Sequence, residues 1–217
     1  MALGVFSIGL LTGSAMATTL TFQDTMNYFP GYSNGTGDDL RDEIGNPNVE
    51  SMTITFDEES DNLLQSVVVN MTNRRHFDTL FINNDSAGQG WDFMIRDTKS
   101  RNDSLGKDGG FYSVAENYTY TIVTKTSYRE GHPFGIEMND LTLINTTLPV
   151  IWDVDASTLT YNFSNYAIYL ADTFNFGYAP DCANDVMMTT VPEPASMLLF
   201  GAGLAGLAGI VTRRRKN

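Results

Sequence analysis

The chain has 217 residues, of which 13 are Lys or Arg and 26 are Asp or Glu, so its formal net charge is −13. This acidity argues against a nucleic-acid-binding protein, because phosphate contacts require clustered basic side chains. A single cysteine excludes an intrachain disulfide and any multi-cysteine metal site, whereas 42% hydrophobic residues are enough to build a folded core.

Residues 1–17 carry no charged side chain and end in Ser14-Ala15-Met16-Ala17. An apolar stretch closed by an Ala-x-Ala pattern is typical of a secretory signal peptide, in which Ala15 and Ala17 are the small residues that signal peptidase requires. The segment lacks the Lys or Arg that normally precedes the apolar run. The alternative interpretation is a buried first strand.

Four segments in the middle of the chain alternate between apolar and polar residues, which is typical of half-buried β-strands. They are Met52–Phe56, Val67–Met71, Tyr118–Ile122 and Leu159–Phe163. Turn-forming residues separate them, and long stretches with helical periodicity are missing from this part of the sequence. We therefore predict an all-β protein in which residues 18–186 form a single antiparallel β-sandwich or jelly-roll-like ectodomain.

Acidic residues in the predicted loops are candidates for binding Ca²⁺, which prefers six to eight oxygen ligands. The best candidates are Asp85, Asp92, Asp153 and Asp155. None of them fits an EF-hand loop, and acidic loops are commonly only solvated. Calcium is therefore the one cofactor that the sequence suggests, and no metal site is assigned.

Trp91 and Trp152 are each followed by an aspartate. An indole ring can stack on a sugar while the neighbouring carboxylate binds the sugar's hydroxyls, so both tryptophans are candidates for glycan contact. The alternative is that both are buried core residues. Cys182 with His76 or His132 matches no nucleophile motif. We assign no catalytic residue and expect a protein that is not an enzyme, with a glycan hydrolase or lyase as the alternative.

The C-terminal segment from Ala195 to Thr212 contains 18 residues without a charge, enough for a helix of ~27 Å that just spans the hydrocarbon of a bilayer. Arg213, Arg214, Arg215 and Lys216 follow it and predict a stop-transfer signal that stays cytoplasmic. A glycine-rich buried helix is the alternative. The side chains that favour insertion are Leu198, Leu199, Phe200, Leu204, Leu207, Ile210 and Val211.

Pro192-Glu193-Pro194, the apolar span and the arginine cluster follow one another in that order at the C-terminus. This arrangement resembles the PEP-CTERM sorting signal. The resemblance implies an exported bacterial protein that is processed by exosortase, a membrane-embedded cysteine peptidase or transpeptidase, with Pro192, Glu193 and Pro194 as the recognition motif. Residues 187–217 would form this signal, beginning with a short stalk over residues 187–191.

Parts of the middle also resemble an ectodomain that recurs in PEP-CTERM proteins, which implies a β-sandwich and no known activity. The similar segments are Asp78–Asn83, Trp91–Phe93, Gly131–Pro133 and Cys182–Val186.

The sequence thus predicts a protein that is exported, anchored in the inner membrane as a precursor, and then placed at the cell surface or in the extracellular matrix. The expected partners are signal peptidase, exosortase, the inner membrane and extracellular polysaccharide, but no nucleic acid. A structural or adhesive role in a biofilm matrix is the first hypothesis. A calcium-dependent protein that binds or acts on polysaccharide is the second.

Overall fold

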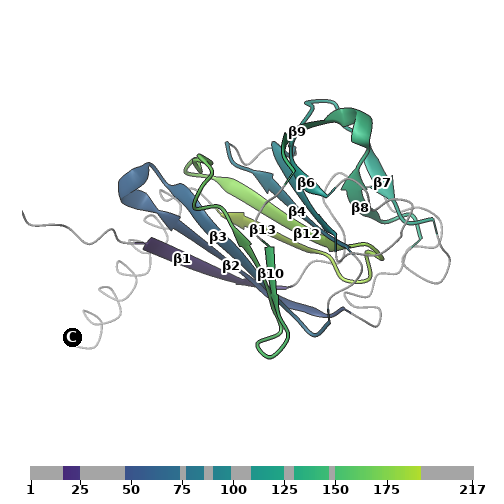
Figure 1. The fold of residues 1–217 in the computed structure, drawn as a ribbon, viewed down its shortest axis with the longest axis horizontal. Helices are drawn as coiled ribbons and strands as arrows, with labels where there is room; N and C mark the ends of the chain where they lie inside the picture. The colour runs from purple at the N-terminus through teal and green to yellow at the C-terminus, as the bar shows by residue number, and fades with distance from the viewer. Residues whose placement is uncertain are drawn as a thin grey trace, which may run out of the picture.

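The computed structural model describes residues 17–24, 47–73, 77–85, 90–98, 109–124, 130–146 and 150–191 (Figure 1). Within them the chain forms antiparallel β-sheets, with helical structure limited to two short 3-10 turns, η1 (Glu58–Ser60) and η2 (Met138–Asp140). The all-β prediction is therefore confirmed. The predicted signal segment before Ala17 and the predicted C-terminal helix lie outside the described residues.

The first sheet has five strands in the order β1-β2-β3-β11-β10. They are β1 (Ala17–Gln23), β2 (Val49–Asp57), β3 (Leu63–Met71), β11 (Thr158–Asn162) and β10 (Val150–Asp153). All neighbours are antiparallel. Two of the four segments predicted from alternation fall in β2 and β3, and the third falls in β11 except for its last residue, Phe163. The fourth corresponds to a shorter strand, β7, that begins at Tyr120.

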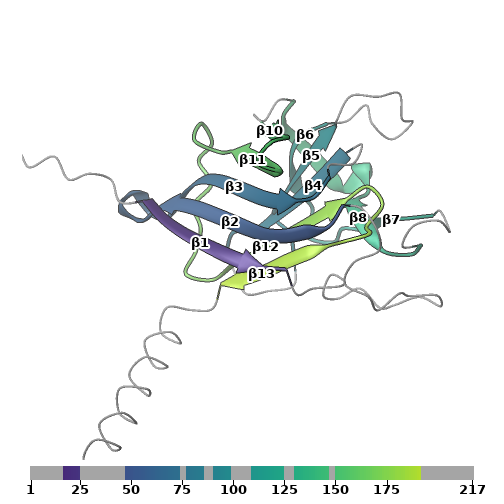
Figure 2. The ribbon, with the colours of Figure 1, turned by 90° about the horizontal axis from the view of Figure 1, so that it is seen from below.

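The second sheet has six strands in the order β13-β12-β4-β5-β6-β9. They are β13 (Met187–Val191), β12 (Phe174–Pro180), β4 (Phe77–Asn83), β5 (Phe93–Thr98), β6 (Gly110–Val114) and β9 (Leu141–Asn145). Figure 2 shows this sheet stacked against the five-stranded one, with β1 and β13 at the same margin of the sandwich.

The main core fills the space between the two sheets. Met52, Ile54 and Phe56 point inward from β2 and meet Phe174 and Phe176 of β12. Each such side chain stabilises the fold by roughly 1.5–3 kcal/mol when it is fully buried. The burial of these inward apolar residues therefore favours the packing of the two sheets into a sandwich. The outward positions of β2 carry mainly Ser and Thr.

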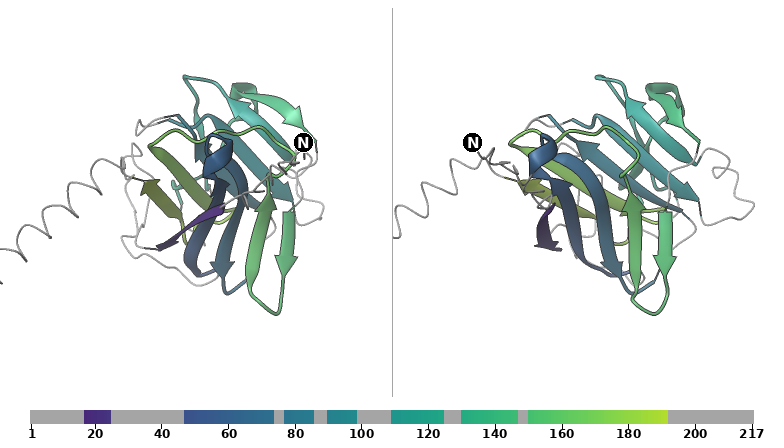
Figure 3. Two further views of the ribbon diagram at one scale, coloured as in Figure 1. Left: turned by 90° about the vertical axis from the view of Figure 1, so that its left-hand side faces the viewer. Right: turned by 60° about the vertical axis from the view of Figure 1, so that its left-hand side comes forward.

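A second core lies on the opposite face of the six-stranded sheet. It forms where a two-stranded ribbon of β7 (Tyr120–Ile122) and β8 (Pro133–Ile136) packs against β5 and β12. Phe134 and Ile136 of the ribbon contact the same cluster as Phe81, Met94 and Tyr112. Both panels of Figure 3 show the ribbon beside this sheet. All seven residues of β12 are consequently buried.

Residues Met187–Val191, predicted as a stalk, form strand β13 instead. This strand pairs with β12 from Phe174↔Val191 to Tyr178↔Met187, and Met187 is fully buried in the main core. The prediction of a stalk was wrong because Met187 and Val191 pack into the main core and the segment pairs with β12 as an edge strand. The sandwich therefore extends to Val191 rather than ending at residue 186.

Candidate functional site

Strand β13 is the part of the described structure that lies next to the predicted sorting motif. Met187, Thr189 and Val191 occupy the positions paired with Tyr178, Phe176 and Phe174, whose side chains belong to the main core. Pro192 follows Val191 directly. Because proline has no backbone N–H to donate, it cannot continue the ladder of hydrogen bonds, and the strand ends where the motif begins.

Thr189 is a weak point in the middle of β13. Its side chain is only 3% exposed, yet its hydroxyl finds no hydrogen-bond partner within the part of the chain that the structure describes. Thr79 on β4 is in the same situation, with a fully buried hydroxyl that also has no partner among the described residues. A buried polar group without a partner lowers the stability of the fold by about 1–3 kcal/mol. Thr189 therefore stabilises the pairing of β13 less than an apolar residue of the same size would.

The first residue of β1 and the last residue of β13 lie at the same end of the sandwich. Val191 pairs with Phe174, whose ring packs edge-on against Phe56 at 5.9 Å between centroids. Phe56 in turn pairs with Thr18 on β1. The predicted cleavage residue Ala17 is the first residue of β1, whereas Ala15 lies outside the described residues.

The remaining predicted sorting residues also lie outside the described part of the chain. These are Pro192, Glu193 and Pro194 of the motif, the span from Ala195 to Thr212, and the cations from Arg213 to Lys216. Among the residues that the structure does describe, no helix is long and apolar enough to cross a membrane.

Trp91 lies in the second core and is 6% exposed. Its indole nitrogen donates a hydrogen bond to the hydroxyl of Tyr120 at 2.8 Å, and that hydroxyl lies 3.4 Å from the hydroxyl of Tyr118. Burial raises the pKa of Tyr118 and Tyr120 above the ordinary value. This environment agrees with a buried core tryptophan and leaves little of the ring for a sugar.

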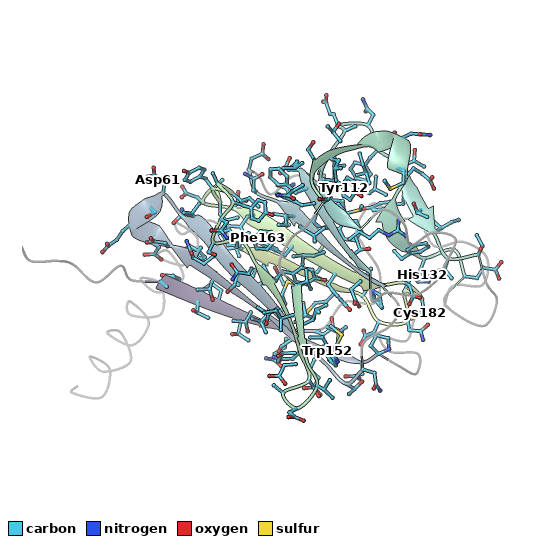
Figure 4. The ribbon with its side chains drawn as sticks, in the orientation of Figure 1. Asp61, Tyr112, His132, Trp152, Phe163 and Cys182 are labelled. Carbon is cyan, nitrogen blue, oxygen red and sulfur yellow. The ribbon has the colours of Figure 1, made fainter. Side chains whose placement is uncertain are left out.

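Trp152 has a different environment. It lies on β10, an edge strand of the five-stranded sheet, and is half-buried against the main core. Figure 4 shows its side chain near the lower end of the sandwich. The neighbouring Ile151 points to the outer face and is 61% exposed. Trp152 is therefore the more accessible of the two tryptophans.

The four calcium candidates fall into two separate turns. The carboxylate of Asp92 accepts a hydrogen bond from the backbone N–H of Asn84 at 2.8 Å, and its pKa is raised, first by burial and further by the nearby charge of Asp85. The carboxylate of Asp153 accepts from the N–H groups of Asp155 and Ala156, each at 3.0 Å, and so caps the turn between β10 and β11. Within the described residues, no group of three or more His, Cys, Asp or Glu side chains is placed to hold a metal ion.

Two buried aspartates that the sequence analysis did not single out connect separate parts of the fold. Asp185, in the loop between β12 and β13, accepts a hydrogen bond from the backbone N–H of Val49 at the start of β2. Asp78 on β4 accepts one from the hydroxyl of Tyr178 on β12. Both carboxylates are almost fully buried. No local sequence pattern distinguishes them from solvated acids, because their burial depends on strands that are distant in sequence.

The hydrogen bond from Tyr178 gives a direct stability prediction. Replacing Tyr178 with phenylalanine keeps the ring but removes a donor to the buried Asp78 carboxyl group, so we expect a loss of about 1–3 kcal/mol in the free energy of unfolding. Denaturant titration measures this loss. Tyr118→Phe is the control, because that hydroxyl makes only a long 3.4 Å contact at a half-buried position. Equal losses for the two variants would contradict the role given to Tyr178.

Cys182 and His132 are both buried, at 1% and 2% exposure. Figure 4 shows them at the end of the sandwich opposite Asp61. The burial of Cys182 agrees with a packing role for its thiol. His76 lies outside the described residues.

Uncharged polar side chains of adjacent strands meet on the outer face of the five-stranded sheet. Hydroxyls of adjacent strands meet there: Thr21 and Thr53 are 3.0 Å apart and Thr19 and Thr55 are 3.4 Å apart. Further along the same face, the Asn70 amide donates to Ser51 at 2.7 Å. These pairs hold hydroxyl and amide groups in fixed positions on a protein with a net charge of −13.

Comparison with known proteins identifies the C-terminal segment. Residues 190–216 match the family model described as the PEP-CTERM protein-sorting motif. The match begins at Thr190, inside β13, so the last two residues of the sandwich belong to both the fold and the motif. Searches of curated proteins and of solved structures gave no match. The resemblance to the PEP-CTERM sorting signal is thus confirmed, and the motif indicates a protein that is exported and sorted to the cell surface by exosortase.

Proposed function

We propose that this protein is a surface or extracellular-matrix module whose β-sandwich is delivered by exosortase and then serves a structural or adhesive role in a polysaccharide matrix. The observation that carries the proposal is the PEP-CTERM motif at residues 190–216, which begins within the last strand of the fold. In this proposal signal peptidase removes the segment that ends at Ala17, and the inner membrane holds the precursor through residues 195–212 until exosortase acts.

A polysaccharide-binding role is the second candidate, favoured by the outer face of the five-stranded sheet. The Thr19, Thr21, Thr53 and Thr55 hydroxyls on this face suit hydrogen bonding to sugar hydroxyls, and these side chains carry no charge that would repel an acidic polymer. Calorimetric titration of the exported domain with a glycan panel, with and without Ca²⁺, tests this role. An absence of heat with every glycan under both conditions removes it.

The sorting proposal predicts a difference between cells that contain exosortase and cells that lack it. With an epitope placed after β1, the protein from cells that contain the enzyme is expected at the surface or in the medium without its C-terminal tail. Cells that lack the enzyme are expected to retain the full precursor in the inner membrane. Fractionation followed by immunoblotting measures both. An intact tail in both strains would refute the proposal.

A further inference from the structure

We propose that the outer face of the five-stranded sheet binds an uncharged, extended polysaccharide that runs across the strands, with about one sugar unit to each strand. The inference rests on the polysaccharide-binding role given above as the second candidate function. It deepens that role because it specifies the charge, the shape and the direction of the polymer. Delivery of the protein by exosortase does not enter the argument, so either proposal can fail without the other.

The register of the five strands places their outward side chains in three rows that cross the sheet. The rows are Thr19, Thr55, Ser66 and Asn162 (the hydroxyl row); Thr21, Thr53, Val68, Thr160 and Ile151 (the central row); and Gln23, Ser51, Asn70, Thr158 and Asp153 (the amide row). Figure 3 shows these strands side by side. Neighbouring strands lie about 4.7–4.9 Å apart, which is close to the length of one pyranose unit in an extended chain. A polymer that crosses the strands therefore meets equivalent groups at each successive sugar.

The central row is the least polar of the three. Val68 is half-buried, Ile151 is 61% exposed, and each threonine of the row adds a methyl group. In a flat β-linked chain, each sugar ring carries C–H groups on its two faces and hydroxyls around its edge. The rows lie about 7 Å apart along the strands. A ring above the central row therefore rests its C–H groups on the apolar side chains and directs its hydroxyls toward the two flanking rows.

The threonine hydroxyls are held in pairs that suit sugar hydroxyls. Thr21 and Thr53 are 3.0 Å apart, and Thr19 and Thr55 are 3.4 Å apart. In each pair one hydroxyl donates to the other, so the accepting hydroxyl keeps its own hydrogen to donate outward, and the oxygen lone pairs can accept. Each pair thus offers a donor and acceptors at a fixed position, which matches the donor and acceptor character of adjacent sugar hydroxyls.

The charge of the face determines the charge of the polymer. Among the described residues that form the three rows, Asp153 is the single charged side chain, and its carboxylate already accepts two backbone hydrogen bonds in its own turn. An acidic polymer would find no Lys or Arg in these rows to pair with, and the net charge of −13 would repel it. A neutral polymer meets neither disadvantage. The rows also lack aromatic side chains, so the affinity has to come from many weak contacts along an extended chain.

Calorimetric titration of the exported protein with two series of oligosaccharides tests the inference. For neutral β-1,4-linked gluco-oligosaccharides, which form flat extended chains, we expect the affinity to rise several-fold with each added sugar. The rise should level off at about five sugars, because the sheet has five strands. For oligomannuronates of the same lengths, which have a similar shape but carry carboxylates, we expect about tenfold weaker binding or none.

Two substitutions at opposite ends of the central row test the direction of the polymer. Thr21 lies on β1 and Ile151 on β10, the two outermost strands of the sheet. Thr21→Glu places a charge in the row, and we expect it to weaken binding of the longest neutral oligosaccharide about fivefold or more. Ile151→Ala removes an exposed apolar contact and is expected to weaken binding about threefold. A polymer that runs along the strands could contact only one of the two positions.

Thr142→Glu is the matched control, because it places the same charge on an exposed threonine of β9, an edge strand of the six-stranded sheet. Its affinity is expected to stay within about twofold of the native chain. Circular dichroism checks that each variant is folded; if Thr21→Glu is not, Ile151→Ala decides alone, because that side chain is mostly exposed.

Four results would overturn the inference. They are no binding of any neutral oligosaccharide by the folded native chain, tighter binding of the oligomannuronates, an affinity that does not depend on length, and an affinity that either row variant leaves unchanged. A protein that exosortase sorts correctly but that shows one of these results would refute the polysaccharide site and leave the delivery proposal standing.

Discussion

A chain that ends at Val186 is expected to lose cooperative folding, whereas a chain that ends at Val191 is expected to keep it. The five residues between these ends form β13, which buries Met187 completely and covers the edge of β12. Their removal exposes Phe174, Phe176 and Tyr178, which face the main core. Losing the burial of Met187 alone costs roughly 1.5–3 kcal/mol, and exposure of the paired aromatic rings adds to this.

The expected total approaches the whole stability of a typical domain, which is about 5–15 kcal/mol. Thermal unfolding followed by circular dichroism measures the effect on both chains, each beginning at Ala17. A chain ending at Val186 that unfolds cooperatively at the same temperature as the longer one would contradict the assignment of β13 to the fold.

The second large effect is expected for Phe163→Ala. Phe163 follows β11 directly, is fully buried, and packs edge-on against Phe111 of β6 with 6.3 Å between ring centroids. It therefore joins the five-stranded sheet to the six-stranded sheet within the main core. Truncation to alanine removes a ring and leaves a cavity, which we expect to cost about 3–5 kcal/mol in the free energy of unfolding.

Ile151→Ala is the matched control for that substitution. Ile151 lies on β10, the neighbour of β11, but points outward and is 61% exposed. A surface truncation of this kind changes stability by no more than ~0.5 kcal/mol. Denaturant titration of both variants measures the difference. Similar losses for the two would mean that Phe163 does not join the sheets as described.

The sequence predicts those strands that expose one face to solvent. In β2, β3 and β11 the inward residues are apolar and the outward residues, apart from Val68, are polar, so the alternation is visible in the sequence. β12 lacks this signal because it lies between two cores and buries both faces. β13 was missed for a different reason. It is only five residues long, and it ends at a proline-rich motif that is typical of a linker.

The sequence predicted some of the candidate sites and missed the environment of others, and the reasons are again physical. The sorting motif is local in sequence, so Pro192, Glu193 and Pro194 could be identified without a fold. The environment of Trp91 could not be identified without the fold, because the ribbon that helps bury this residue comes from β7 and β8, further along the chain. Asp153 is close in sequence to Asp155, yet its carboxylate is engaged by the backbone of its own turn. Sequence proximity among acids does not show where their oxygens point.

The intact mass of the protein recovered from cells that contain exosortase tests the central claim most directly. The account predicts a folded chain that begins after the segment ending at Ala17, retains β13 through Val191, and lacks the apolar span and the arginine cluster beyond the sorting motif. Recovery of the complete 24.0 kDa chain with both ends uncut, as the only species at the surface or in the medium, would contradict it.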